Sequence, residues 1–332
     1  MKLVIQIPCY NEAESLPHLI PQLPRQVIGC DRVEWLVIDD GSVDDTAGVA
    51  ARLGVDRVVR HPVNRGLAAA FMSGLEAAVA GGADIIVNTD ADNQYDARDI
   101  ETLVRPIIDG RAEMVIGARP ITETEHFSWL KKRLQGLGSR VVRLASNTQV
   151  TDAPSGFRAF TREAAQRLNV FSSYTYTLET IIQAGHSNIR VLSVPIRTNP
   201  DLRPSRLVKS MRHYVWRSAS TIVRIFATYR PLMFFWLVAA FFLVVGGLLG
   251  GWYVFHMLAG QGSGHVQSAL LAAASFTIGL ILFMLGFIAD LQAVNRRLLE
   301  AIDWRVRQLE PPASPAAKSV ESPAWAAREK SE

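Results

Sequence analysis

Short apolar runs alternate with amphipathic stretches along the first 120 residues. The apolar runs are strand candidates and lie at 3–8, 34–40, 56–61, 84–90 and 113–119. The stretches between them repeat apolar residues three and four positions apart, as helices do, at 14–27, 44–53, 66–80 and 98–109. Apolar strands that alternate with helices are typical of a parallel sheet with helices on both faces. The pattern therefore predicts a mostly parallel α/β fold.

Two long apolar segments follow near the C-terminus. Segments 232–255 and 266–289 each contain 24 residues and no charge. At about 1.5 Å per residue, each helix would extend about 36 Å, enough to cross a hydrocarbon core of roughly 30 Å. No acidic residue occurs between Asp201 and Asp290, which disfavours a buried hairpin of a soluble protein. We therefore expect two transmembrane helices.

Basic residues predict how these helices are oriented. Seven of the 35 Lys and Arg residues fall in the segment 203–230, hereafter the basic segment, which contains no acidic residue. Four arginines follow the second apolar segment within residues 296–307, whereas the loop 256–265 has no Lys or Arg. The positive-inside rule then places the loop outside and both termini, with the N-terminal domain, in the cytoplasm.

The charged residues outside the basic segment indicate which kinds of binding partner to expect. Outside the basic segment, 28 basic residues do not outnumber the 31 acidic residues, so general nucleic-acid binding is not expected. The basic segment itself has the pattern of an amphipathic helix at a bilayer surface, where it would attract anionic headgroups. Cys9 and Cys30 are too few for a disulfide framework.

We predict the following organisation of the chain. Between residues 120 and 200 the pattern predicts helices at 128–147 and 177–184 and a strand at 189–196. The expected units are a cytoplasmic domain over 1–200, juxtamembrane helices over 201–230, a transmembrane hairpin over 231–290, a cytoplasmic helix over 291–310 and a disordered tail over 311–332.

Polar residues gather where three of the predicted strands end. They form the clusters 8–12, 39–42 and 90–94. Because ligands of open parallel sheets bind beyond the carboxyl ends of the strands, these clusters predict one functional edge. Asp90 and Asp92 stand two residues apart in an extended segment and point the same way, so Mg²⁺ or Mn²⁺ would relieve their repulsion.

The second acidic cluster has two interpretations. The carboxylates of Asp39 and Asp40 would accept hydrogen bonds from a ribose or a base. Gly41 and Ser42 also suit a plain turn followed by a helix cap.

Several segments together resemble one known family. They are IPCYNEAESL, VIDDGSVDDT, NRGLAAAFMSGL, NTDADNQYD, MVIGAR, TDAPSGFRAF and VPIRTNPDLRPSRL. Over about residues 1–230 they are similar to the GT-A fold, family 2 glycosyltransferases, most of all to the polyprenyl-phosphate glycosyltransferases such as dolichol-phosphate mannose and glucose synthases. The resemblance implies a Rossmann-like α/β domain, and the paired apolar segments fit the membrane-anchored members.

The resemblance also implies residue roles. Donor-binding residues would be Pro8, Tyr10, Glu12, Asp39, Asp40, Arg65, Gly66 and Asp90, and metal ligands would be Asp90, Asp92 and Gln94. The acceptor phosphate would meet Arg119, Ser155, Arg158, Arg206 and Lys209, and the residues expected to act in catalysis are Asp92, Asp152 and Arg119. Asp152 would orient the acceptor or act as a base. The chain departs from many relatives at Asn93, where they have Leu, and at 203–206.

The implied activity is inverting transfer of a sugar from a nucleotide sugar to a membrane polyprenyl phosphate. We favour a UDP-sugar carrying glucose or N-acetylglucosamine, with GDP-mannose as the alternative donor. An inactive, membrane-tethered scaffold that binds nucleotide sugars is the alternative of another class. Small residues at 246–251 would also let helices pack closely in a homo-oligomer.

Overall fold

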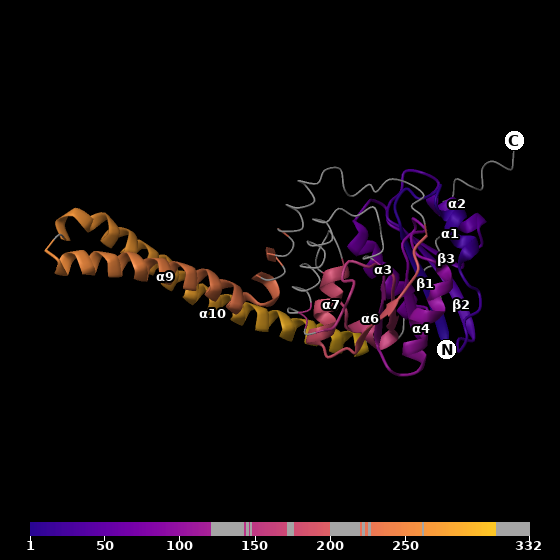
Figure 1. Cartoon of the computed structure of the whole chain (residues 1–332). Coiled ribbons are helices and arrows are strands. Elements are labelled where there is room, and N and C mark those ends of the chain that lie inside the picture. The colour runs from indigo at the N-terminus through magenta and orange to yellow at the C-terminus, as the bar shows by residue number, and fades with distance from the viewer. Residues whose placement is uncertain are drawn as a thin grey trace.

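The computed structural model describes residues 1–120, 143, 146, 148–170, 176–199, 220, 223–224, 227–260 and 262–309. A body built on one β-sheet carries the N-terminal part of the chain, and two long helices project from it as a hairpin (Figure 1). The expected division into an α/β domain and two apolar helices is therefore confirmed.

The sheet has seven strands. They are β1 (Lys2–Cys9), β2 (Arg32–Asp39), β3 (Arg57–Arg60), β4 (Ile85–Asn88), β5 (Met114–Ala118), β6 (Arg158–Thr161) and β7 (Val191–Pro195). Their order is β3-β2-β1-β4-β6-β5-β7, and all run in one direction except β6. The carboxyl ends of β1, β2 and β4 thus share one edge, as the sequence predicted.

Helices cover both faces of this sheet. They are α1 (Leu16–Leu19), η1 (Ile20–Gln22), α2 (Thr46–Arg52), α3 (Leu67–Ala80), η2 (Ala97–Asp99), α4 (Ile100–Ile108), α6 (Arg162–Arg167) and α7 (Thr177–His186). One core cluster joins α3, α6 and α7 to the sheet face that includes Val4, and the other joins α1, η1, α2 and α4 to the face that includes Leu3 and Ile5. Successive residues of β1 point to opposite faces, so its mostly apolar sequence is buried on both sides.

One helix predicted from the sequence is much shorter in the structure. The apolar repeat over 14–27 predicted a single helix, but only α1 and η1 form there. Pro21 and Pro24 interrupt the stretch, because a proline ring has no N–H to donate to the preceding turn.

The strand β6 was not predicted. It is antiparallel, lies between β4 and β5, and pairs Arg158 with Asn88 at the edge where β4 ends. Its four residues include a buried arginine, so they lack the apolar run that marked the other strands. The antiparallel direction places the start of β6 at the functional edge.

Two C-terminal helices are long and apolar enough to cross a membrane. They are α9 (Pro231–Leu258) and the first part of α10 (Val266–Leu309), and the mean hydropathy over 18 consecutive residues reaches 2.6 within Pro231–Leu258 and 2.3 within Val266–Arg296. They are joined through η3 (Gly262–His265) and pack side by side, for example through Trp236 stacked on Phe283 (Figure 1). The helix expected separately at 291–310 instead continues α10, because no Gly or Pro occurs between Gly286 and Pro311 to end it.

The helical hairpin is joined to the sheet domain by side-chain contacts. The Tyr229 hydroxyl, just before α9, donates to Glu179 Oε1 on α7 at 3.1 Å. The Arg296 guanidinium of α10 lies 4.4 Å from the centre of the Tyr229 ring. Tyr229 is 6% exposed and belongs to the core cluster of the α3 face.

Several predictions concern residues that the structure does not describe. These are the tail 311–332, almost all of the helix expected at 128–147, and most of the basic segment with Arg206 and Lys209. The proposed domain boundaries likewise stay predictions.

Gly41 provides a test of the turn after β2. Its φ is +69°, and a Cβ there would lie 2.4 Å from the carbonyl carbon of Val63 and 2.6 Å from the amide nitrogen of Asn64. Gly54 has a similar φ of +76° but open space around it. Gly41→Ala should therefore destabilise the protein by about 1–3 kcal/mol more than Gly54→Ala, the matched control. Thermal unfolding of the purified full chain checks this, and equal midpoints for the two variants would contradict it.

Candidate active site

The loops that follow β1 and β2 are tied together at the sheet edge. The backbone N–H of Asn11 donates to Ser42 Oγ at 2.9 Å, and Asn11 Oδ1 accepts from the N–H of Val43 at 2.9 Å. The N–H of Glu12 donates to Thr46 Oγ1 at 2.9 Å. The first two polar clusters are thus one connected surface, on which the side chain of Tyr10 is exposed.

Asp39 and Asp40 differ in what holds them. Asp39 is fully buried, and its Oδ1 accepts from the N–H of Ser42 at 2.9 Å while Oδ2 lies 3.2 Å from Arg60 Nε. Both oxygens of Asp40 accept backbone hydrogen bonds, from Arg65 at 2.9 Å and from Gly66 at 2.8 Å. Asp40 therefore fixes the loop that begins α3.

A histidine that the sequence analysis did not select completes this arrangement. His61 follows β3 and is 5% exposed. Its Nδ1 lies 2.6 Å from Asp40 Oδ1, and its Nε2 lies 3.0 Å from Ser73 Oγ on α3. The position directly after a strand, on the same edge as Asp40, was the signal available in the sequence. Arg65 itself has an exposed side chain and Gly66 starts α3 at a φ of +91°.

The carboxylate pair follows β4. A Cβ at Gly156 would lie 2.8 Å from both oxygens of Asp90, so Asp90 occupies the space that the missing side chain leaves. Asp92 Oδ1 accepts from the backbone N–H of Gln94 at 3.1 Å. Burial, and next the charge of Asp92, raise the pKa of Asp90 to about 7, against the opposing effects of Arg119, Tyr95 and Arg158.

The carboxylates of Asp90 and Asp92 suit a divalent cation that also coordinates phosphate oxygens of a substrate. In the part of the chain that the structure describes, no three His, Cys, Asp or Glu side chains gather closely enough to hold a metal by themselves. Mg²⁺ and Mn²⁺ bound with phosphates typically use one or two carboxylates, the remaining ligands being phosphate and water oxygens. Asp90 and Asp92 match that donor set, and a bound cation would favour the charged form of Asp90, whose pKa burial raises.

Arg119 stands opposite the carboxylate pair at the end of β5. Its Nε and Nη2 donate to the two oxygens of Asp152 at 2.8 and 3.1 Å, and its Nη1 approaches Gln94 Oε1 at 3.5 Å. Burial would lower the pKa of Arg119, but its hydrogen bond to Asp152 and the neighbouring negative charges raise that pKa above its usual range. Because Asp152 is 1% exposed and doubly bonded, it suits the orientation of Arg119 better than proton abstraction.

Arg158 is completely buried. Its guanidinium donates to the carbonyls of Ser155, Ala153 and Thr177 at 2.7–2.8 Å and to Thr180 Oγ1 at 2.6 Å. Burial lowers its pKa to about 10. A direct contact with an acceptor phosphate, expected from the sequence, would have one remaining N–H donor, because these bonds engage four of the five and the side chain is buried. The geometry instead makes Arg158 the support of the loop 153–155, in which Ser155 is also buried.

A buried polar network supports the site from beneath. Gln6 Nε2 donates to Asn88 Oδ1 at 2.9 Å, and Asn88 Nδ2 donates to the carbonyl of Gly156 at 2.8 Å and to the Tyr176 hydroxyl at 2.9 Å. The Tyr95 hydroxyl accepts from the N–H of Gly156 at 3.0 Å. The sequence analysis missed this network, although amides within the apolar strands β1 and β4 were a visible signal.

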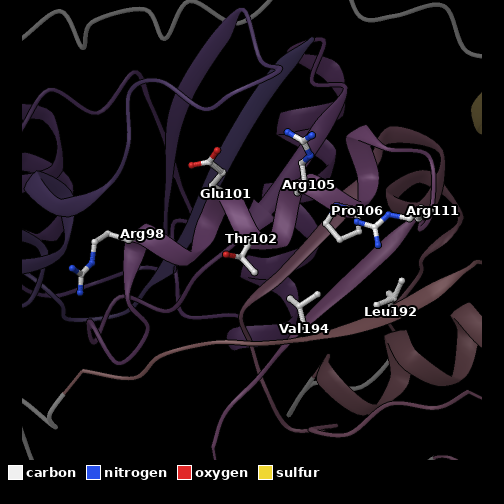
Figure 2. A pocket seen from close by; sticks show the side chains of 8 residues that line it. All are labelled: Arg98, Glu101, Thr102, Arg105, Pro106, Arg111, Leu192 and Val194. Atoms are coloured by element: carbon white, nitrogen blue, oxygen red, sulfur yellow. The ribbon is translucent and has the colours of Figure 1, made fainter.

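A shallow groove of about 500 Å³ lies elsewhere, between α4 and the edge strand β7 (Figure 2). Three arginines line it, but Arg98 pairs with Asp96, and Arg105 and Arg111 pair with Asp109. None of the predicted site residues lines this groove, so it is separate from the edge that holds Asp90.

Known proteins resemble this chain over the same region. Residues 4–168 match the family described as glycosyl transferase family 2. A UDP-N-acetylglucosamine–dolichyl-phosphate N-acetylglucosaminyltransferase of Methanococcus voltae is 30% identical over 58% of this chain and 83% of its own length. A polyprenol monophosphomannose synthase of Mycolicibacterium smegmatis is 28% identical over 59% of this chain and 76% of its own length.

A solved structure has the same fold. Glucosyl-3-phosphoglycerate synthase from Mycobacterium tuberculosis, in complex with Mn²⁺, UDP and phosphoglyceric acid, superposes with a TM-score of 0.53. The match covers 68% of this chain and 78% of that one, at 22% identity, and confirms the GT-A fold that the sequence predicted. The matched family, the relatives and the shared fold agree: this chain belongs to glycosyl transferase family 2.

Proposed function

We propose that this protein transfers a sugar, with inversion, from a nucleotide sugar to a polyprenyl phosphate in the membrane. One observation carries the proposal: the charges of Asp92 and Arg119 both act on the buried Asp90, on a chain that also has two helices long enough to cross a bilayer. The carboxylates suit a diphosphate leaving group with its cation, and the apolar helices suit an acceptor held in lipid.

The donor would bind along the ends of β1, β2 and β4. Asp39 and the surface formed by Tyr10 and Glu12 are candidates for the base and ribose, and the loop held by Asp40 brings Arg65 and Gly66 to the same edge. We favour a UDP-sugar carrying glucose or N-acetylglucosamine. GDP-mannose is the second candidate, because one relative is named for mannose transfer and another for N-acetylglucosamine transfer.

The acceptor would approach from the side of the basic segment. Arg206 and Lys209, which we assign to the acceptor phosphate, lie between the sheet domain and the first apolar helix in the sequence. The charge pattern around the two helices supports a cytoplasmic location for the active site and both termini. The prenyl tail would then remain in the bilayer while its phosphate meets the basic residues.

The reaction needs little proton abstraction. A phosphate monoester is largely dianionic near neutral pH, since its second pKa is about 6, so one of its oxygens can attack the anomeric carbon directly. The bond from that carbon to the nucleoside diphosphate breaks on the opposite side, and the diphosphate takes the electron pair. A bound Mg²⁺ or Mn²⁺ supplies charge stabilisation for that leaving group. Arg119, oriented by Asp152, provides a fixed positive charge beside it.

A nucleotide-sugar panel distinguishes these possibilities. Membranes containing the full chain, given radiolabelled polyprenyl phosphate, should form a chloroform-soluble glycolipid with one of UDP-glucose, UDP-N-acetylglucosamine or GDP-mannose. Formation of product with none of them, while the purified protein still binds nucleotide sugar, would favour the inactive scaffold. Transfer only to water-soluble acceptors would contradict the lipid acceptor.

Asp92→Asn should abolish transfer. The amide keeps the shape of the side chain but removes one of the two charges that attract the cation, so we expect a loss of at least about a hundredfold in turnover and weaker metal-dependent donor binding. Asp109→Asn, directly after α4, is the control, because the ion pairs of Asp109 among the described residues are with Arg105 and Arg111, away from the site. Full activity of Asp92→Asn would refute the metal role.

Asp152→Asn tests whether Asp152 acts through Arg119. Loss of a charged hydrogen-bond partner should lower kcat/KM by about 10- to 100-fold. In an Arg119→Ala background the same change should cost little more, because the oriented group is already gone. A general base would give additive losses in the double variant and would remove the acidic limb of the pH profile, and either result would overturn the positioning role.

A further inference from the structure

Three residues beyond β7 lie along the turn that carries the carboxylate pair. This segment, Arg197–Asn199, precedes the basic segment in the sequence, and Thr198 forms an isolated antiparallel bridge with Tyr95. The carbonyl of Arg197 accepts from the N–H of Asp96 at 3.4 Å. The chain on its way to the apolar helices therefore contacts the backbone that follows Asp92.

Asn199 makes the contacts nearest to the carboxylates. Its backbone N–H donates to the carbonyl of Gln94 at 2.8 Å. Its side-chain Nδ2 donates to the carbonyl of Asn93 at 3.0 Å and to that of Tyr95 at 3.3 Å. One side chain thus bridges two carbonyls on either side of Gln94, within three residues of Asp92.

Arg197 fixes the other end of the segment. Its backbone N–H donates to Asp99 Oδ2 at 2.6 Å, and its guanidinium Nη2 lies 2.5 Å from Asp99 Oδ1. Asp99 is the last residue of η2 and is 5% exposed. The segment is therefore held at both ends against the stretch 93–99.

The turn that follows the carboxylates needs such support. Asn93 has a φ of +57°, a left-handed conformation that costs a non-glycine residue energy, and it is 5% exposed. Strained backbone persists where surrounding contacts hold it, and the Asn93 carbonyl is one of the two that Asn199 holds.

We propose that Asn199 is a positioning residue for the metal-binding turn: it holds the backbone at 93–95 so that Asp92 and Gln94 are presented beside Asp90. The inference rests on the proposed function, which makes this turn the cation site. Residues that orient ligands typically change metal affinity 10- to 100-fold when they are lost. The side chain of Asn199 donates to the backbone carbonyls of Asn93 and Tyr95 and is not itself proposed as a cation ligand. The first measurable effect of its loss should therefore be weaker cation binding.

The test measures Mn²⁺ binding to the full chain in detergent micelles. Free Mn²⁺ is followed by electron paramagnetic resonance, with Mn²⁺ alone and in the presence of UDP or GDP. Asn199→Ala should weaken nucleotide-dependent Mn²⁺ binding about tenfold, with a similar or larger loss for Asn199→Asp, which places an acceptor against two carbonyls. Asn199→Asp also preserves the side-chain shape, so it decides the matter if Asn199→Ala does not fold.

Arg190→Ala is the matched control. Arg190 lies just before β7, and its side chain is about as exposed as that of Arg197. It pairs with Glu113 at 3.4 Å, at the end of β7 opposite to Asn199. This variant should bind Mn²⁺ within twofold of wild type, and thermal midpoints of all variants show whether folding changed. Wild-type binding by both Asn199 variants, or an equal loss in Arg190→Ala, would overturn the positioning role alone. A wild-type protein that fails to bind Mn²⁺ with either nucleotide would overturn the proposed function as well.

Discussion

The structure depends on a carboxylate that is buried next to another carboxylate. Asp90 lies against the backbone of Gly156 and near Asp92, and its raised pKa records that burial and repulsion oppose its charge. Two negative charges this close in a poorly hydrated place are costly unless a cation neutralises them. This unfavourable pair lies just after β4, and the neighbouring residues pack around it.

Two arginines, Arg119 and Arg158, act on Asp90 by their charge but donate their hydrogen bonds to other groups. Arg119 gives its two strongest hydrogen bonds to Asp152, and Arg158 donates to carbonyls and a hydroxyl rather than to a carboxylate. Both arginines contribute to the field at Asp90 without occupying its oxygens. Under the proposed function, the cation and the diphosphate of the donor would bind at these carboxylates.

The sequence predicted the apolar strands and the polar strand ends well, because burial on both faces leaves an unmistakable pattern in β1, β2 and β4. The sequence did not predict features whose stabilising contacts come from distant parts of the chain. The strand β6 contains Arg158, whose burial is satisfied by carbonyls from the loop 153–155 and from α7, and no short window reveals such partners. The role of Asn199 was equally hidden, since its contacts lie more than 100 residues away in the chain.

The resemblance implies which residues belong to the site, and the coordinates show what holds each of them. Both oxygens of Asp40 and most donors of Arg158 are engaged by the backbone, whereas one oxygen of Asp39 is so engaged and Arg119 pairs with Asp152. Sequence motifs group residues that act directly with residues that hold them in place, and hydrogen-bond partners distinguish the two.

The unbroken helix α10 has a consequence for the proposed lipid acceptor. From Arg296 to Leu309 it continues beyond the apolar stretch by about 20 Å, at 1.5 Å per residue, and it reaches α6 of the sheet domain (Figure 1). Under the proposed function, this continuous helix would link the height of the sheet domain to the position of the apolar helices in the bilayer. A lipid acceptor would then reach the catalytic edge by lateral diffusion, a search in two dimensions.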